Sequence, residues 1–187
     1  VFFGFCIDHD HLFSEIENKE YIRSLEQDFL FAYRSCAKQY VDCMTRKSIC
    51  ENISKNHSNI DVRTYFRLEG FHNRRLSNSL KKFLNKFQNQ LIKPPSNQDF
   101  SVITSHFKSL PYISLLSVYS VVDVNFDEEK NNNFPSLFYT IFPENNQTNI
   151  ILSCFSSNYP NYQNLFDYLS SLPDNQIEIF HSKIIIS

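Results

Sequence analysis

The sequence predicts an α+β fold, with a helical N-terminal half followed by an antiparallel β-sheet with C-terminal helices. Two observations lead to this prediction. Residues 1–93 place apolar side chains three and four positions apart, which is typical of amphipathic helices. Residues 98–187 contain short runs rich in Val, Ile, Leu and Phe between polar connectors, which is typical of strands. The segment 94–97, Pro-Pro-Ser-Asn, is the candidate linker between two regions that form either two domains or one composite domain.

A first long helix is expected from about Tyr21 to Ser54, because this stretch contains neither Pro nor Gly. One apolar stripe runs along it at helical spacing. Residues 52–59 are polar and predict a loop after this helix. The stripe consists of Leu25, Phe29, Tyr33, Cys36, Tyr40, Cys43 and Cys50.

A second helix is expected to begin at Asp61, whose carboxylate is a suitable N-cap. We expect Gly70 to interrupt it, because glycine is a poor helix former. Another apolar stripe then continues to Leu91, after which Pro94 and Pro95 end the helix. This stripe consists of Leu76, Leu80, Phe83, Leu84, Phe87 and Leu91.

The C-terminal half is expected to form an antiparallel meander covered by helices. Runs of β-branched and aromatic residues predict the strands, and polar connectors at 127–133 and 143–147 separate them. The expected strands are residues 100–107, 112–126, 136–142 and 149–155, and the expected helices are residues 159–172 and 174–186, with Asp174 as N-cap.

Composition excludes several classes of protein. The chain of 187 residues has only two glycines, Gly4 and Gly70, so it contains no P-loop, no dinucleotide-binding G-x-G-x-x-G and no nucleophile elbow. No apolar run is long enough to cross a bilayer, so no membrane association is expected. An odd number of cysteines, five, argues against a disulfide scaffold and favours a cytoplasmic location.

Three of these cysteines, Cys36, Cys43 and Cys50, recur every seven residues. On a helix, seven residues rise about 10.5 Å, which exceeds the reach of a disulfide or of two thiolates on one zinc ion. We therefore interpret them as small apolar side chains on a packing face.

The segment Phe5-Cys6-Ile7-Asp8-His9-Asp10-His11 has the densest cluster of potential metal ligands. Cys6 and His9 have the spacing of half a zinc site, and His11 is a further candidate ligand. In one alternative, Cys6 is a buried side chain in a strand, followed by a solvated His-Asp turn. In another, a histidine acts as general base beside a metal held by the aspartates. The chain opens on Val1 in the middle of a pattern, so we expect the missing zinc ligands upstream.

Residues 70–98 contain six lysines and arginines and no acid. Five side chains of this span are candidate phosphate contacts: His72, Arg74, Arg75, Lys81 and Lys82. The alternative is an ordinary solvated helix face, which pairs with the acidic residues between positions 8 and 28.

The pattern Phe5-Cys6, His9-Asp10, Leu12-Phe13 and Glu15-Ile16-Glu17, followed by Phe29 to Arg34, resembles a group of uncharacterised bacterial proteins. Residues 142–144, Thr148 and residues 150–153 resemble the C-terminal part of that group. The resemblance implies an upstream Cys-x2-Cys zinc-ribbon or HNH-like segment, which this sequence does not include, and a zinc site completed by Cys6 and His9.

Together these observations predict a zinc-associated bacterial protein that acts on or binds nucleic acid, such as an HNH-like nuclease or a phage-defence component. The alternative is a non-enzymatic interaction module, or a subunit of a larger complex, that binds a protein partner or a second copy of itself. Its 19 Phe and 10 Tyr would supply the large apolar area of such an interface.

Overall fold

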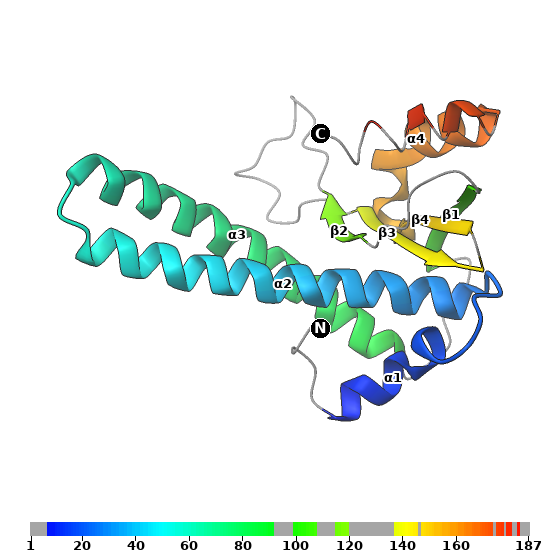
Figure 1. Cartoon of the computed structure of the whole chain (residues 1–187), viewed down its shortest axis with the longest axis horizontal. Coiled ribbons are helices and arrows are strands. Elements are labelled where there is room, and N and C mark those ends of the chain that lie inside the picture. The colour runs from blue at the N-terminus through cyan, green and yellow to red at the C-terminus, as the bar shows by residue number, and fades with distance from the viewer. Residues whose placement is uncertain are drawn as a thin grey trace.

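A long antiparallel helical hairpin packs on one face of a four-stranded sheet, and a shorter helix covers the other face (Figure 1). The computed structural model describes residues 7–91, 99–107, 115–119, 137–145, 147–173, 175–177, 179–180 and 183. The predicted α+β class, with helices first and an antiparallel sheet after them, is confirmed.

Three helices form the N-terminal half: α1 (Ile7–Glu17), α2 (Leu25–Asn56) and α3 (Ile60–Leu91). Ser24 caps α2, and its hydroxyl accepts a hydrogen bond from the backbone N–H of Gln27 at 3.2 Å. The predicted cap of α3 at Asp61 is wrong by two residues. The side chain of Asn59 accepts from the N–H groups of Asp61 and Val62 at 2.8 and 3.1 Å, so the loop between the helices is only residues 57–59.

The expected interruption at Gly70 is also wrong, because α3 continues through it. A Cβ atom at this position would lie 3.3 Å from the Cβ of Cys50 on α2. Glycine therefore lets the two helices approach closely. The packing of α3 against α2 outweighs the local cost of a helical glycine, about 1 kcal/mol relative to alanine.

The sheet has the strand order β1-β4-β3-β2, and every neighbouring pair is antiparallel. Its strands are β1 (Phe100–Phe107), β2 (Leu115–Tyr119), β3 (Leu137–Glu144) and β4 (Gln147–Phe155). The expected connector at 143–147 is too long, since Glu144 still pairs with Gln147. Asn145 begins the tight turn with a φ of 49°, a conformation that asparagine tolerates better than most residues.

Alternate side chains of β3 enter two separate cores. Phe138 packs with α2 and α3, and the hydroxyl of Thr140 lies 2.9 Å from that of Ser35 on α2. Leu137, Tyr139 and Ile141 instead pack under α4. Because both faces of the central strands are covered, β4 is apolar along most of its length rather than alternating.

Helix α4 (Tyr159–Ser171) follows a single 3-10 turn, η1 (Ser156–Asn158), and confirms the helix expected from residue 159. Residues 175–177 and 179–180 are also helical, as the last predicted helix requires. Its expected cap, Asp174, and its expected end at Ile186 lie outside the described residues, as does much of the strand predicted at 112–126. Among the residues that are described, no helix combines the length and apolar character needed to cross a bilayer.

Candidate nucleic-acid interface

The part of the α2–α3 hairpin farthest from the sheet is basic. Residues 44–75 contain seven lysines and arginines against three acids, whereas the whole chain has a net charge of −2. This half of the hairpin projects beyond the sheet, at the left of Figure 1. Positive charge is therefore concentrated at one end of an otherwise acidic molecule.

A shallow groove runs along this part of the hairpin, between α2 and α3. One hollow, of about 170 Å³, is lined by Phe66, Arg67, Gly70, Phe71 and Arg74 from α3 and by Glu51 and Ser54 from α2. A second hollow, of about 140 Å³, is lined by Ile60, Arg63, Thr64 and Arg67 from α3 and by Ser54 from α2. The two hollows share Ser54 and Arg67, so we treat them as one surface, the hairpin groove. It is too small and open for an enclosed ligand, but an extended anionic chain can lie along it.

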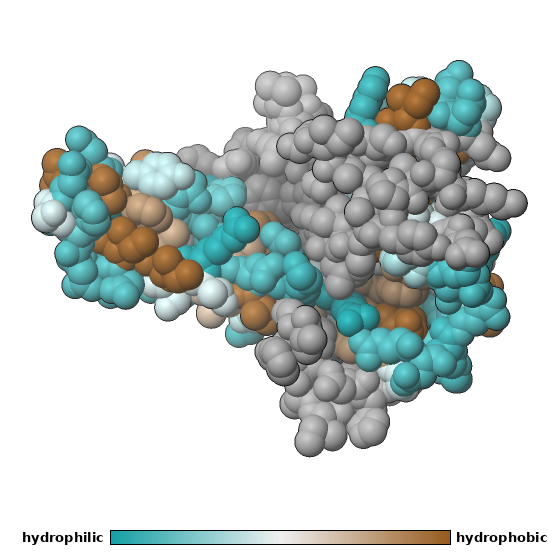
Figure 2. All heavy atoms as spheres, in the orientation of Figure 1, coloured by the Kyte–Doolittle hydropathy of each residue, from teal (hydrophilic) through white to brown (hydrophobic). Residues whose placement is uncertain are grey.

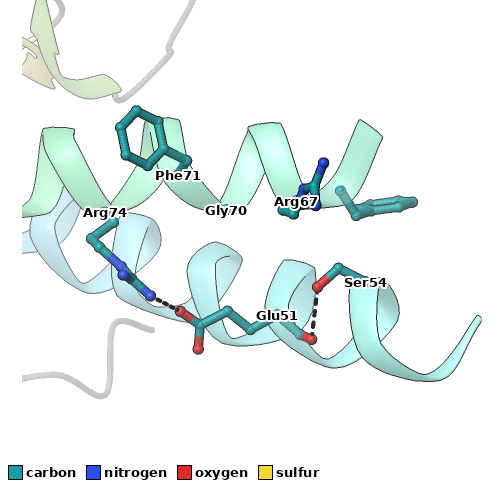
Figure 3. A pocket seen from close by; sticks show the side chains of 7 residues that line it. Glu51, Ser54, Arg67, Gly70, Phe71 and Arg74 are labelled. Carbon is teal, nitrogen blue, oxygen red and sulfur yellow. Dashed lines mark hydrogen bonds and ion pairs between the residues drawn. The ribbon is translucent and has the colours of Figure 1, made fainter. Parts of the chain in front are cut away.

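Glu51 is the acid that lines the hairpin groove. Its Oε1 accepts a hydrogen bond from Nη2 of Arg74 at 2.7 Å, which Figure 3 shows reaching across from α3 to α2. This hydrogen bond, with the nearby charges of Lys47, Arg74 and Lys55, lowers the pKa of Glu51 below its usual range. The acid therefore stays ionised at neutral pH and offsets part of the positive potential of the groove.

The five predicted phosphate contacts lie on α3 but do not share one face. Arg74 lines the hairpin groove, and exposed Lys81 lies two turns farther along the same side. Exposed His72 and Lys82 lie on other sides of the helix. Arg75 does not line the groove, and its guanidinium lies 6.0 Å from the centre of the ring of Phe71, which does.

Arg63 and Arg67 also line the groove. The sequence analysis did not select them as phosphate contacts, because they precede the helix break that was expected at Gly70. With α3 continuous, Arg63, Arg67, Arg74 and Lys81 recur at spacings of four, seven and seven residues. Residues at these intervals lie on one side of a helix. In a helix that continues through Gly70, this spacing predicts that the four basic side chains lie on one side.

The alternative, in which the basic helix pairs with the acidic segment 8–28, is not what the structure shows for Arg74 or Lys86. Arg74 pairs with Glu51 of α2. The ammonium of Lys86 donates to the hydroxyl of Ser157 at 2.9 Å and lies 4.0 Å from the centre of the Phe155 ring. Glu17, from the acidic segment, pairs instead with Arg34 at 2.7 Å.

No protein-family model matches the chain, and no curated protein or solved structure is significantly similar to it. Function is therefore inferred from the residues themselves.

The predicted zinc ligands are only partly placed by the structure. Cys6 lies outside the described residues, and His9 and His11 belong to the first part of α1, residues 7–11, where only the backbone is described. The alternative of a solvated turn at this point is wrong, because residues 7–17 are helical. Positions 9 and 11 do not share a face of that helix. Within the described ranges, no group of three or more His, Cys, Asp or Glu residues is placed to hold a metal ion.

Cys36, Cys43 and Cys50 are free and buried, as the seven-residue spacing predicted. Burial raises the pKa of each thiol, most strongly that of Cys36. The fourth described cysteine, Cys154 on β4, is also buried, which raises its pKa to about 12. These thiols are therefore poor nucleophiles and poor zinc ligands at neutral pH.

A buried acid, Asp28, lies in the first turn of α2 and is only 4% exposed. The hydroxyl of Tyr21 donates to its Oδ1 at 2.6 Å, and the backbone N–H of Tyr21 donates to Oε1 of Glu144 at 2.9 Å. Burial raises the pKa of Asp28 to about 6, which the hydrogen bond from Tyr21 partly opposes. The arrangement ties the segment before α2 to the end of β3, and no cavity adjoins it among the described pockets.

Proposed function

We propose that this protein binds nucleic acid along the hairpin groove, through its phosphate backbone. The observation that carries the proposal is the row of arginines, Arg63, Arg67 and Arg74, on one side of a projecting hairpin. A guanidinium group matches phosphate oxygens with paired hydrogen-bond donors. The row is about 16 Å long, which spans several consecutive phosphates of one strand.

The shape of the hairpin favours contact with the backbone over reading of bases. A single helix is about 10 Å wide, so two helices side by side do not enter a major groove of about 12 Å. Arginines along a shallow surface then contact phosphates of a single strand or of one duplex edge. Such binding is expected to discriminate little between sequences and to weaken as the salt concentration rises.

The narrower predictions, a zinc site at Cys6, His9 and His11 and an HNH-like nuclease or phage-defence role, remain predictions from the sequence. A bacterial origin and a cytoplasmic location likewise remain expectations.

A second candidate function is a protein-interaction module. It is favoured by exposed apolar side chains on the outer side of α3, including Leu68 at 63% and Tyr65 at 58% exposure. Leu68 and Tyr65 do not line the hairpin groove, so the two functions do not exclude each other.

Alanine substitutions in the hairpin groove test the proposed function. Arg67→Ala and Arg74→Ala are each expected to weaken binding to a labelled single strand about fivefold, since each removes a phosphate contact of about 1 kcal/mol. Fluorescence anisotropy at low salt measures the affinity. The control is Arg46→Ala, because Arg46 is exposed on the same hairpin but lies roughly 140° around α2 from Glu51. Equal losses in all three variants would contradict a defined groove.

Neutralising the acid in the groove is expected to have the opposite effect. Glu51→Gln keeps the shape of the side chain and removes one negative charge, so that Arg74 contacts phosphate without a competing carboxylate beside it. We expect binding to become about threefold to tenfold tighter. The matched control is Glu26→Gln, an exposed acid at the other end of α2, which should change the affinity less than about twofold. Unchanged affinity for Glu51→Gln would place the bound strand elsewhere.

A further inference from the structure

An exposed aromatic ring lies at the edge of the hairpin groove. Phe71 lines the larger hollow together with Arg67 and Arg74, and its side chain is 59% exposed. Figure 3 shows Phe71 on α3, pointing away from α2, whereas Arg74 reaches toward Glu51. Phe66, which lines the same hollow, is less exposed. Phe71 therefore forms the outer rim of the groove on the side of α3.

Guanidinium groups lie close to this ring. Arg67 precedes Phe71 by about one helical turn, and Arg74 follows it by about one turn. The guanidinium of Arg75 lies 6.0 Å from the centre of the ring. Figure 2 shows the same mixture on the projecting hairpin, where hydrophobic side chains lie among hydrophilic ones.

This mixture of an aromatic ring and cations selects the kind of ligand. An apolar protein surface that covered Phe71 would also remove the neighbouring guanidinium groups from water, which costs free energy. A nucleotide instead joins an aromatic face to an anion, so it offers a partner both to the ring and to the guanidinium groups.

We infer that the hairpin groove selects single-stranded nucleic acid, in which an unpaired base stacks on Phe71 while the arginines hold the neighbouring phosphates. The inference rests on the proposed function and adds to it the class of strand. In a single strand, a base can turn out onto an aromatic side chain. In a duplex, neighbouring base pairs cover the face of each base, so the ring reaches a base only after it is unstacked, which costs free energy.

The layout of the groove suits a strand whose backbone lies between the two helices. Arg67 and Arg74 are about 10.5 Å apart along the helix axis, and Phe71 lies between them. A base between two phosphates held at these arginines projects away from α2, over the rim that carries Phe71. Because a phenyl ring has no hydrogen-bonding group, it stacks on any base without reading its edge. The expected ligand is therefore a single strand of either DNA or RNA, bound with little preference for sequence.

Phe71→Leu tests the inference, because leucine is apolar and a good helix former but cannot stack on a base. The variant should bind a labelled single strand of about 20 nucleotides about fivefold to tenfold more weakly in fluorescence anisotropy, and a duplex of the same sequence less than about twofold more weakly. Tyr65→Leu is the matched control, since Tyr65 is 58% exposed on the same helix but does not line the groove. The control should change either affinity less than about twofold, and circular dichroism verifies that each variant is folded.

A strand of the same length that lacks bases separates stacking from phosphate contact. The wild-type chain should bind this abasic strand about fivefold to tenfold more weakly than the normal strand, whereas Phe71→Leu should bind the two strands within about twofold. The chain contains no tryptophan, so Phe71→Trp places a single indole at the rim. The normal strand should quench its fluorescence, because a base stacks on the indole, and the abasic strand should not.

Each outcome either supports or overturns the inference. Equal affinity of the wild-type chain for the normal and abasic strands overturns it, as does an equal loss of single-strand and duplex binding in Phe71→Leu. In either case, a loss of binding in Arg67→Ala shows that the proposed function still holds. Absence of binding to every strand at low salt contradicts the proposed function and the inference with it. DNA and RNA single strands of one sequence should bind within about threefold, and a difference above about tenfold would overturn recognition by base and phosphate alone.

Discussion

Phe87→Ala is expected to destabilise the fold by about 3–5 kcal/mol, the cost of removing a fully buried aromatic side chain. Phe87 is 0% exposed and joins the helical hairpin to the sheet. Its ring centre lies 5.0 Å from that of Phe29 on α2, 5.1 Å from that of Phe138 on β3 and 4.7 Å from that of Phe155 on β4. The substitution leaves a cavity where four elements meet, and a loss of this size is a large part of the stability of a single domain.

Urea unfolding followed by circular dichroism measures this loss. Phe71→Ala is the matched control, because it removes the same side chain from the same helix at a position that is 59% exposed. The control should change the free energy of unfolding by less than about 0.5 kcal/mol. Similar losses in the two variants would contradict the packing of α3 against the sheet.

Asp28→Asn is expected to stabilise the protein at neutral pH and to flatten its pH dependence. Burial raises the pKa of Asp28 from 3.8 to about 6, so the folded state holds its proton more tightly than the unfolded state. Below about pH 4 the group is largely protonated in both states, and its ionisation costs little. As the pH rises through 6, ionisation costs the folded state up to about 3 kcal/mol, and stability falls.

The side-chain amide that Asp28→Asn introduces can still accept the hydrogen bond from Tyr21, but it does not ionise. We therefore expect a gain of about 1–3 kcal/mol at pH 8 and little change at pH 4. Chemical unfolding at several pH values provides the measurement. Asp42→Asn is the control, because Asp42 is 42% exposed and pairs with Lys38 at 3.1 Å. Wild-type stability that rises between pH 4 and 6 relative to Asp28→Asn would show that Asp28 is not destabilised by burial.

Much of the fold could be predicted because its signals are local. The apolar run from Ile150 to Phe155 and the stripes of the two long helices predict their elements from nearest neighbours alone. The strand order is different, since the pairing of β1 with β4 depends on contacts between residues about fifty positions apart. The continuity of α3 at Gly70 likewise depends on a residue that is distant in the sequence. The propensity of Gly70 predicts a break, but a small residue on another helix, Cys50, makes it a packing position.

The candidate site could be predicted only in part, because some of its residues are brought together by contacts that are not local in the sequence. The positive charge of Arg74 and Lys81 stands out in the sequence, whereas Arg63 and Arg67 join them only when α3 is continuous. The role of Glu51 could not be predicted, because it comes from the facing helix and its link to Arg74 spans 23 positions. A groove between two helices results from how the helices pack, which the apolar stripe of either helix does not predict by itself.

The central claim, that arginines of the hairpin groove contact phosphates, is tested most directly by the salt dependence of binding to a single strand of about 20 nucleotides. Each phosphate contact on a single strand contributes about −0.7 to the slope of log affinity against log salt concentration. The account predicts that replacing Arg63, Arg67 and Arg74 together by alanine makes this slope shallower by about 2, with the fold intact. An unchanged slope, or no binding by the wild-type chain at low salt, would contradict it.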